Sequence, residues 1–128
     1  MEGLNDGPLA VVATDEFEEW MMSLTEKQRD AVMDAIDHLR QEGPSLGRPY
    51  VDTIRDSRFK NMKELRISSG GALRVLFAFD PRRTAVLLLG GDKSKGSKWN
   101  DWYPDAIQQA DKLFSQYLQT QGDQGHDN

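Results

Sequence analysis

The sequence contains no cysteine and only two histidines, His38 and His126, among its 128 residues. The absence of cysteine excludes disulfides, thiol catalysis and thiolate metal sites. Because the two histidines are far apart in the sequence, we expect no histidine metal site and no cofactor. No apolar run approaches the roughly 18 residues that a membrane helix needs, and the start lacks a signal-peptide pattern. We therefore expect a soluble, cytoplasmic protein without membrane contact.

The net charge of −5 at pH 7 is at first sight unfavourable for a nucleic-acid ligand, but the charges are unevenly distributed. Residues 40–100 carry 13 Lys and Arg against 6 Asp and Glu, whereas the rest of the chain carries 3 against 15. A basic middle between acidic ends is typical of a protein with one surface for a polyanion and another for something else. Two ordinary solvated surfaces would give the same distribution.

Length and patterning predict a single α+β domain over residues 9–119, with a flexible segment at 1–8 and a disordered tail at 120–128. The expected architecture is a small antiparallel sheet of about four strands, packed with two N-terminal helices and one C-terminal helix. The expected elements are a strand at 9–13, helices at 14–22 and 25–42, an irregular connection at 45–61, strands at 62–68, 72–79 and 84–89, and a helix from about 104 to 119.

Particular residues mark the ends of these helices. Thr25 and Gln28 have the spacing of a capping box, which predicts a helix start. Gly43 and Pro44 end that helix. Pro104 suits the first turn of the final helix, because proline has no N–H to donate there.

The hairpin at 62–79 can be aligned from the sequence, because Ser-Gly-Gly predicts a three-residue turn. The alignment pairs apolar residues on one side of the sheet: Leu65 with Val75, and Ile67 with Leu73. On the other side it places Arg66 opposite Arg74, next to Glu64. A slip of one residue would mix the two faces. Since like charges placed opposite each other destabilise a sheet, either Glu64 bridges both arginines or an anionic ligand binds them.

A basic loop with an aromatic end follows the third strand of this group. It reads Asp92-Lys93-Ser94-Lys95-Gly96-Ser97-Lys98-Trp99. Its lysines could follow a phosphate backbone while the tryptophan stacks on a base, although a solvated loop explains the composition as well. The pattern GxxxxGK[ST] is absent, so this is not a nucleotide-binding phosphate loop.

The order of these motifs resembles the RelE/ParE toxin superfamily over roughly residues 9–118. The segments Met62-Lys63-Glu64-Leu65-Arg66, Leu73-Arg74-Val75-Leu76-Phe77 and Gly91-Asp92-Lys93 look like the HigB-type, phage-derived Gp49-like branch. The resemblance implies the toxin of a type II toxin–antitoxin system, a metal-independent endoribonuclease that cleaves mRNA on the ribosome and inhibits translation. It also implies a cognate antitoxin, HigA-like and carrying a helix-turn-helix domain, encoded in the same operon.

The resemblance assigns site residues by matching positions. Arg74 matches the arginine at the head of its strand and, with Arg66, should stabilise transition-state charge, since a guanidinium can grip two phosphate oxygens. Tyr103 matches a tyrosine that opens the final helix in RelE, and could orient the substrate, stack on a base or relay a proton. Lys93, in the basic loop that the family shares, is a further catalytic candidate that would hold a phosphate. The candidates for contacts with RNA are Lys95, Lys98, Trp99, Lys60, Lys63 and Arg58; strand parity turns Lys63 toward the opposite face.

The sequence departs from the family pattern in its acid/base groups. No histidine lies between His38 and His126, so the imidazole of some HigB toxins is missing. Glu64 stands where RelE has a second lysine and could act as the general base; otherwise a lysine or tyrosine would handle protons. Two alternatives share the fold and need no acid/base set: a gyrase-poisoning ParE-like toxin, and an inert phage-derived binding module.

Overall fold

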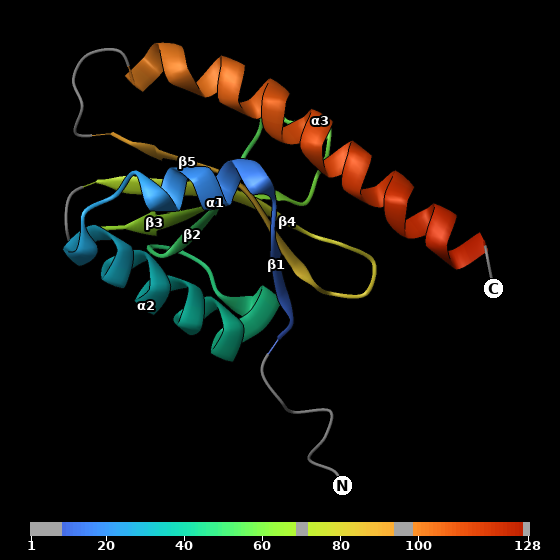
Figure 1. The fold of residues 1–128 in the computed structure, drawn as a ribbon, viewed down its shortest axis with the longest axis horizontal. Coiled ribbons are helices and arrows are strands. Elements are labelled where there is room, and N and C mark those ends of the chain that lie inside the picture. Colours follow the sequence, from blue (N-terminus) through green and yellow to red (C-terminus); the bar gives the residue numbers. More distant parts are fainter. Residues whose placement is uncertain (1–8, 69–71, 94–98, 127–128) are drawn as a thin grey trace, which may run out of the picture.

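The computed structural model describes residues 9–68, 72–93 and 99–126, and only the backbone of 99–101 and 122–126. In this part of the chain, a sheet is covered on one face by two helices and on the other by a third (Figure 1). The elements are β1 (Val11–Ala13), α1 (Asp15–Met22), α2 (Glu26–Glu42), the 3-10 helix η2 (Gly43–Ser45), β2 (Val51–Thr53), β3 (Met62–Ile67), β4 (Leu73–Phe79), β5 (Ala85–Asp92) and α3 (Trp99–His126).

The five strands lie in the order β1-β5-β4-β3-β2. The three pairs from β5 to β2 are antiparallel, and β1 pairs parallel with β5. The α+β class is confirmed, with a mixed sheet of five strands in place of an antiparallel sheet of about four. The parallel pair arises because α1, α2 and three further strands separate β1 from β5 in the chain, so no tight turn constrains their direction.

The predicted hairpin register is confirmed. Leu65 lies opposite Val75, Ile67 opposite Leu73, and Arg66 opposite Arg74. The apolar pairs contact the α1 and α2 side of the sheet, where burial of their side chains holds the register. The two arginines are thereby fixed on the α3 side.

Strand β2 lies in the stretch 45–61 that we expected to be irregular. It has only three residues, and it pairs Val51 with Leu65 and Asp52 with Glu64. So short a strand carries little alternation of its own, and pairing with β3 defines it. The correction matters for the site, because the pairing places Asp52 beside Glu64.

Strand β5 runs to Asp92, three residues beyond the predicted end at Leu89. The register changes between Leu76 and Phe77, so that Leu88 is an extra residue in β5. Beyond this bulge, Gly90 lies against Trp20: a Cβ built on Gly90 would be 2.2 Å from the indole ring. Gly90, which lies beyond the predicted strand end, therefore allows close packing inside the strand.

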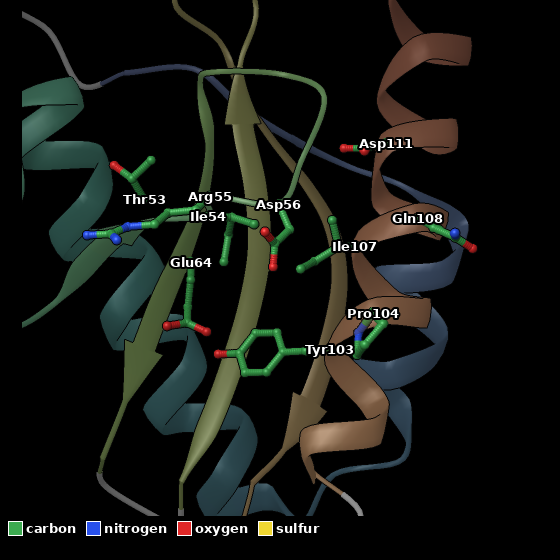
Figure 2. A pocket seen from close by; sticks show the side chains of 10 residues that line it. All are labelled: Thr53, Ile54, Arg55, Asp56, Glu64, Tyr103, Pro104, Ile107, Gln108 and Asp111. Carbon is green, nitrogen blue, oxygen red and sulfur yellow. The ribbon is translucent and has the colours of Figure 1, made fainter.

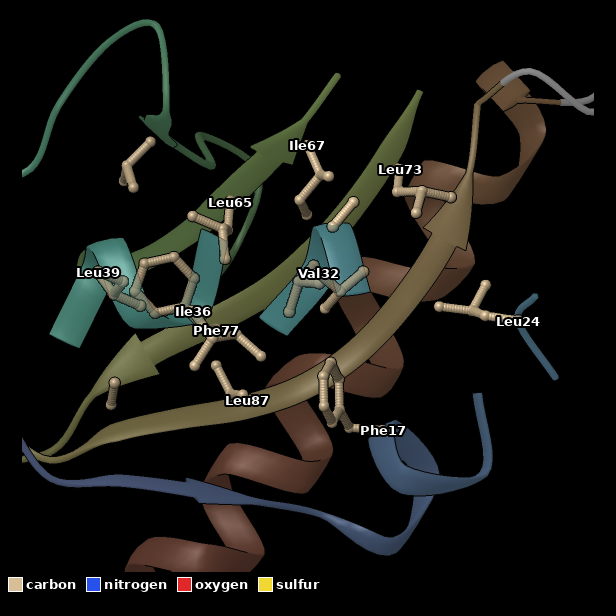
Figure 3. Packing of buried hydrophobic residues seen from close by; sticks show 14 of the residues in the cluster. Phe17, Leu24, Val32, Ile36, Leu39, Leu65, Ile67, Leu73, Phe77 and Leu87 are labelled. Atoms are coloured by element: carbon tan, nitrogen blue, oxygen red, sulfur yellow. The ribbon is translucent and has the colours of Figure 1, made fainter. Parts of the chain in front are cut away.

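Two apolar clusters hold the three layers together. The first joins α1 and α2 to the sheet and includes Phe17, Val32, Ile36, Leu39, Leu65, Phe77 and Leu87 (Figure 3). The second joins α3 to the other face and includes Met62, Leu76, Val86, Leu88, Ile107, Ala110 and Phe114. Burial of these side chains is the main stabilising contribution that each helix makes to the fold.

The helix starts in the N-terminal half follow local rules. Thr14 caps α1 by accepting a hydrogen bond from the N–H of Phe17 at 3.0 Å. Thr25 and Gln28 form the predicted capping box at the start of α2. Gly43 ends α2 with φ = 69°, a conformation that glycine adopts without strain.

Helix α3 is longer than predicted at both ends. It begins at Trp99, so Pro104 lies inside the helix and not in its first turn. It also continues through 120–126, which we expected to belong to a disordered tail. The hydroxyl of Thr120 donates to the carbonyl of Gln116, a bond compatible with helix, and the helix continues through Gly122. Within the described residues, no helix is long and apolar enough to cross a membrane.

Candidate active site

The arginine pair lies on the α3 side of the sheet, near the end of the β3–β4 hairpin. Arg66 and Arg74 are directly opposite each other, which places their Cβ atoms about 5 Å apart. Both side chains are half-buried. Such a pair needs compensating negative charge, and the two arginines differ in how they obtain it.

Arg66 is held by two carboxylates. Its Nε donates to Oε2 of Glu64 at 3.0 Å, and its Nη2 donates to Oδ2 of Asp52 at 3.1 Å. Asp52 also accepts from Arg48 at 3.1 Å. The hydrogen bond from Arg48, with further help from Arg66, lowers the pKa of Asp52 below its usual value of 3.8. These bonds fix the Arg66 guanidinium and largely offset its charge.

Arg74 has no such partners. Its Nη1 donates to the carbonyl of Leu73 at 2.9 Å, and among the described residues it makes no ion pair. Burial lowers the pKa of Arg74, and the charge of Glu64 opposes that shift. The expectation that Glu64 bridges both arginines is therefore met for Arg66 only. The Arg74 guanidinium keeps donors available for an anion.

Glu64 connects the arginine pair to a cavity. Its side chain is buried, with 3% of the residue exposed, and its second oxygen, Oε1, has no hydrogen-bond partner among the described residues. A buried carboxylate oxygen without a partner is energetically costly and is uncommon outside functional sites. Glu64 lines a cavity of about 630 Å³, formed also by Thr53, Ile54, Arg55, Asp56, Tyr103, Pro104, Ile107, Gln108 and Asp111.

Tyr103 is the predicted site residue on α3. Its ring lies on the cavity wall, and its hydroxyl points toward the carboxylate of Glu64 (Figure 2). An edge-to-face contact with Trp102, 5.4 Å between ring centroids, helps to orient the ring. The structure thus brings Glu64, Arg66, Arg74 and Tyr103 to one face of the sheet.

Lys93 follows the last residue of β5 and is exposed. Its N–H donates to the carbonyl of Ala72 at 2.7 Å, and two residues earlier Gly91 lies opposite Arg74. The backbone of Lys93 therefore lies at the arginine end of the sheet. Lys95 and Lys98 lie outside the described residues. Trp99 begins α3, and its side chain is not described.

The other basic candidates lie away from the arginine pair. Arg58 and Lys60 precede β3, at the end of the sheet opposite the β3–β4 turn, and both are exposed. The guanidinium of Arg58 lies 5.6 Å from the centre of the Phe59 ring. Lys63 pairs with Phe77 on the α2 side of the sheet, as strand parity predicted. The structure does not bring these three residues to Arg74.

Three acidic residues of the site were missed in the sequence: Asp52, Asp56 and Asp111. Asp52 went unnoticed because β2 was not predicted, and its alternation with Val51 and Thr53 is too short to detect. Asp56 lies in the connection between β2 and β3. This connection contacts α3, because the hydroxyl of Ser57 and the N–H of Arg58 both donate to the carboxylate of Asp111. A contact between residues more than 50 positions apart leaves no local sequence signal.

Comparison with known proteins identifies the family of the chain. Residues 19–115 match the family described as phage derived protein Gp49-like (DUF891). The chain belongs to this Gp49-like family. It is 47% identical to HigB3 of Mycobacterium tuberculosis, assigned as a toxin, over 86% of this chain and 94% of that protein. It is 46% identical to HigB2 of the same organism, also assigned as a toxin, over 77% of this chain and 49% of that protein.

Solved structures show the same fold at low sequence identity. The toxin–antitoxin complex RelBE2 of Mycobacterium tuberculosis contains a chain that matches with a TM-score of 0.53 and 22% identity, over 67% of this protein and 99% of that chain. The archaeal RelE–RelB complex of Pyrococcus horikoshii OT3 matches with a TM-score of 0.53 and 14% identity, over 70% and 99%. The predicted RelE-like fold is confirmed.

Proposed function

We propose that this Gp49-like protein is the toxin of a type II toxin–antitoxin system and cleaves mRNA on the ribosome. The observation that carries the proposal is the difference between the two arginines. Arg66 is fixed by Glu64 and Asp52, whereas Arg74, directly opposite, keeps donors for a phosphate. The similarity to HigB3 supports the biological role.

The reaction proposed for this site is an internal transesterification of the RNA, which changes no oxidation state and transfers no group to a cofactor. The 2′-oxygen of the RNA attacks the adjacent phosphorus, the bond to the 5′-oxygen breaks, and a 2′,3′-cyclic phosphate and a 5′-hydroxyl form. Arg74 would hold the phosphate and stabilise the charge that develops on it. Lys93, at the same end of the sheet, would add a second positive charge. Arg66 would act by position, holding the carboxylate of Glu64 in place through the bond from its Nε to Oε2.

Proton transfer requires a base for the 2′-hydroxyl and an acid for the 5′-oxygen. Glu64 is the best candidate for the base, because Oε1 has no partner and is aligned by the bond from Arg66 to Oε2. Tyr103, whose hydroxyl points toward Glu64, is the candidate for the acid or for orienting the substrate (Figure 2). This assignment needs no histidine.

The proposed partner is a HigA-like antitoxin with a helix-turn-helix domain, encoded in the same operon, and the proposed place of action is the cytoplasm. Both structural neighbours described above were solved as toxin–antitoxin complexes, which supports a protein partner. Reading the genes next to this one tests the partner directly. An isolated gene without a small neighbour would count against it.

Induced expression in a bacterial host, with mapping of RNA 5′ ends, tests the activity. Wild-type protein should arrest growth and produce new 5′ ends inside translated messages. Arg74→Ala should abolish both effects, while Arg82→Ala, an exposed arginine on the remote β4–β5 turn, should keep them. Arrest with intact messages and damaged DNA would indicate gyrase poisoning. Unimpaired growth would indicate an inert binding module.

A further inference from the structure

The cavity beside the arginine pair is acidic, although it lies in the basic part of the sequence. Three carboxylates line it: Asp56, Glu64 and Asp111. Among the described residues that line it, Arg55 is the one cation. Its side chain points away from the centre of the cavity, whereas Asp56, Ile54 and Ile107 point inward (Figure 2). A phosphate would be repelled here, so this cavity and the Arg74 side chain must serve different parts of a ligand.

The three carboxylates are not equally available. Asp111 accepts hydrogen bonds from the Ser57 hydroxyl and the Arg58 N–H, which satisfy both of its oxygens. Asp56 is exposed and makes no ion pair with any described residue. Glu64 presents Oε1, which is buried and has no partner in the described part of the chain. The cavity therefore offers two available carboxylates, and it calls for a ligand rich in hydrogen-bond donors.

The walls fit a flat, largely apolar ring. Ile54 and Ile107 are buried, with 9% and 7% of each residue exposed, and the Tyr103 ring forms another part of the wall. Aromatic and branched apolar side chains are the surfaces against which unstacked nucleobases pack. A volume of about 630 Å³ accommodates a base together with its ribose.

We propose that this cavity binds the base next to the scissile phosphate and selects bases with an exocyclic amino group. The proposal rests on the proposed function, because it is the phosphate on Arg74 that would bring the base to Glu64. Adenine, cytosine and guanine each present an amino group to Asp56 or Glu64, and guanine adds a neighbouring N–H donor. Uracil presents carbonyl oxygens on both sides of its one N–H donor, and these would face carboxylates. Selection should therefore run against uracil, with guanine bound best.

Binding of nucleotides to the full chain tests this without the ribosome and without cleavage. The probes are GMP and UMP at millimolar concentration, observed through the ¹³C-labelled methyl groups of Ile54 and Ile107. GMP should shift these methyl signals and bind about tenfold more tightly than UMP, the size expected for one good carboxylate contact with a base. Both probes carry a phosphate, so contacts to Arg74 cancel in the comparison.

Asp56→Asn is the variant for the acidic wall, and Asp37→Asn, which changes the same charge on the exposed side of α2, is its control. Asp56→Asn should reduce the preference for GMP over UMP to within about twofold, and Asp37→Asn should leave this preference unchanged. On ribosomes, Asp56→Asn should slow cleavage at sites with amino-bearing bases and spare sites with uracil.

The outcomes separate this inference from the nuclease proposal. Equal shifts with GMP and UMP, or no shift of either methyl group, would overturn the base pocket even if mRNA is cleaved. Base-selective shifts without any cleavage would support the pocket and contradict the nuclease. Shifts produced by arginine amide and not by nucleotides would overturn the proposal in favour of a basic side chain of a partner protein.

Discussion

The hydroxyl of Tyr117 donates a hydrogen bond of 2.8 Å to Oδ2 of Asp80, and this bond fastens α3 to the turn between β4 and β5. Asp80 is buried, and its other oxygen accepts from the N–H groups of Arg82 and Thr84 at 2.9 and 2.8 Å. The turn also holds Arg83 at φ = 67°, a conformation unfavourable for a side chain larger than glycine. Both carboxylate oxygens of Asp80 are thus used to hold strained backbone and helix together.

Replacing Tyr117 with Phe should destabilise the protein by about 1–2 kcal/mol, because Oδ2 of the buried Asp80 loses its partner. Chemical denaturation of the two proteins measures the difference. Tyr50→Phe, which removes a hydroxyl from an exposed ring, is the matched control and should cost little. Equal stability of Tyr117→Phe and wild type would show that Asp80 finds another donor.

The same contact predicts an alkaline limit of stability. Burial and the bond to Asp80 raise the pKa of Tyr117 to about 12, above its usual value of 10. The neutral phenol is therefore favoured by folding, and its contribution is complete below pH 10 and is lost as the pH rises toward 12. The unfolding free energy of wild type should fall more steeply between pH 10 and 12 than that of Tyr117→Phe. Parallel curves would contradict this account.

Gly90→Ala should destabilise the fold by about 1–3 kcal/mol, the usual cost of overpacking. The added Cβ would meet the Trp20 ring at 2.2 Å, so either α1 or the bulged part of β5 has to move. Gly47→Ala is the matched control, because a Cβ there has no neighbour within 4 Å. Thermal unfolding of both variants decides the matter, and a stable Gly90→Ala would mean that Trp20 reorients freely.

The parts of the site that the sequence predicted depend on local patterns. Alternation of apolar residues and a glycine turn were enough to place Arg66 opposite Arg74, because a slip of one residue would bury charges. The capping box at Thr25 is equally local. Both features involve residues close together in the chain, whose geometry follows from the period of a strand or the first turn of a helix.

The acidic part of the site depends on contacts between distant segments, and it was not predicted. Asp52 reaches Arg66 only because β2 pairs with β3, and a three-residue strand has no recognisable pattern. The cavity exists because Asp111 on α3 binds the connection before β3 through Ser57. Such packing is decided by the complete three-dimensional structure. The sequence therefore predicted the arginine pair and Glu64 beside it, but not Asp52, the second carboxylate that holds Arg66.

Asp52 should give the protein an acid-sensitive stability. Its pKa is lowered below 3.8, chiefly by the hydrogen bond from Arg48, so folding favours the carboxylate. The contribution is present above the usual pKa and is lost as the pH falls through the lowered one. Wild type should therefore lose more unfolding free energy than Asp52→Asn as the pH falls from about 5 to about 2. The same loss in both proteins would show that Asp52 is not the group responsible.

Substitution of Arg66 and of Arg74 should affect stability unequally but cleavage equally. Arg66→Ala removes the one partner that the Glu64 carboxylate has among the described residues, and should cost roughly 2 kcal/mol or more. Breaking a fully buried pair costs about 3–5 kcal/mol, but the Arg66 side chain is 36% exposed. Arg74→Ala removes one bond to a carbonyl and should cost less than about 1 kcal/mol. Both variants should lose mRNA cleavage.

A double variant tests whether Arg66 and Glu64 together serve only the fold. Combining Arg66→Met with Glu64→Leu removes the buried charge together with its partner, and should restore most of the stability. Because Glu64 is the proposed base, this protein should fold and still fail to cleave, as measured by denaturation and by mapping of RNA 5′ ends. Recovery of cleavage with recovery of stability would show that Arg66 and Glu64 serve the fold alone, and would leave Arg74 to carry the chemistry with Lys93 and Tyr103.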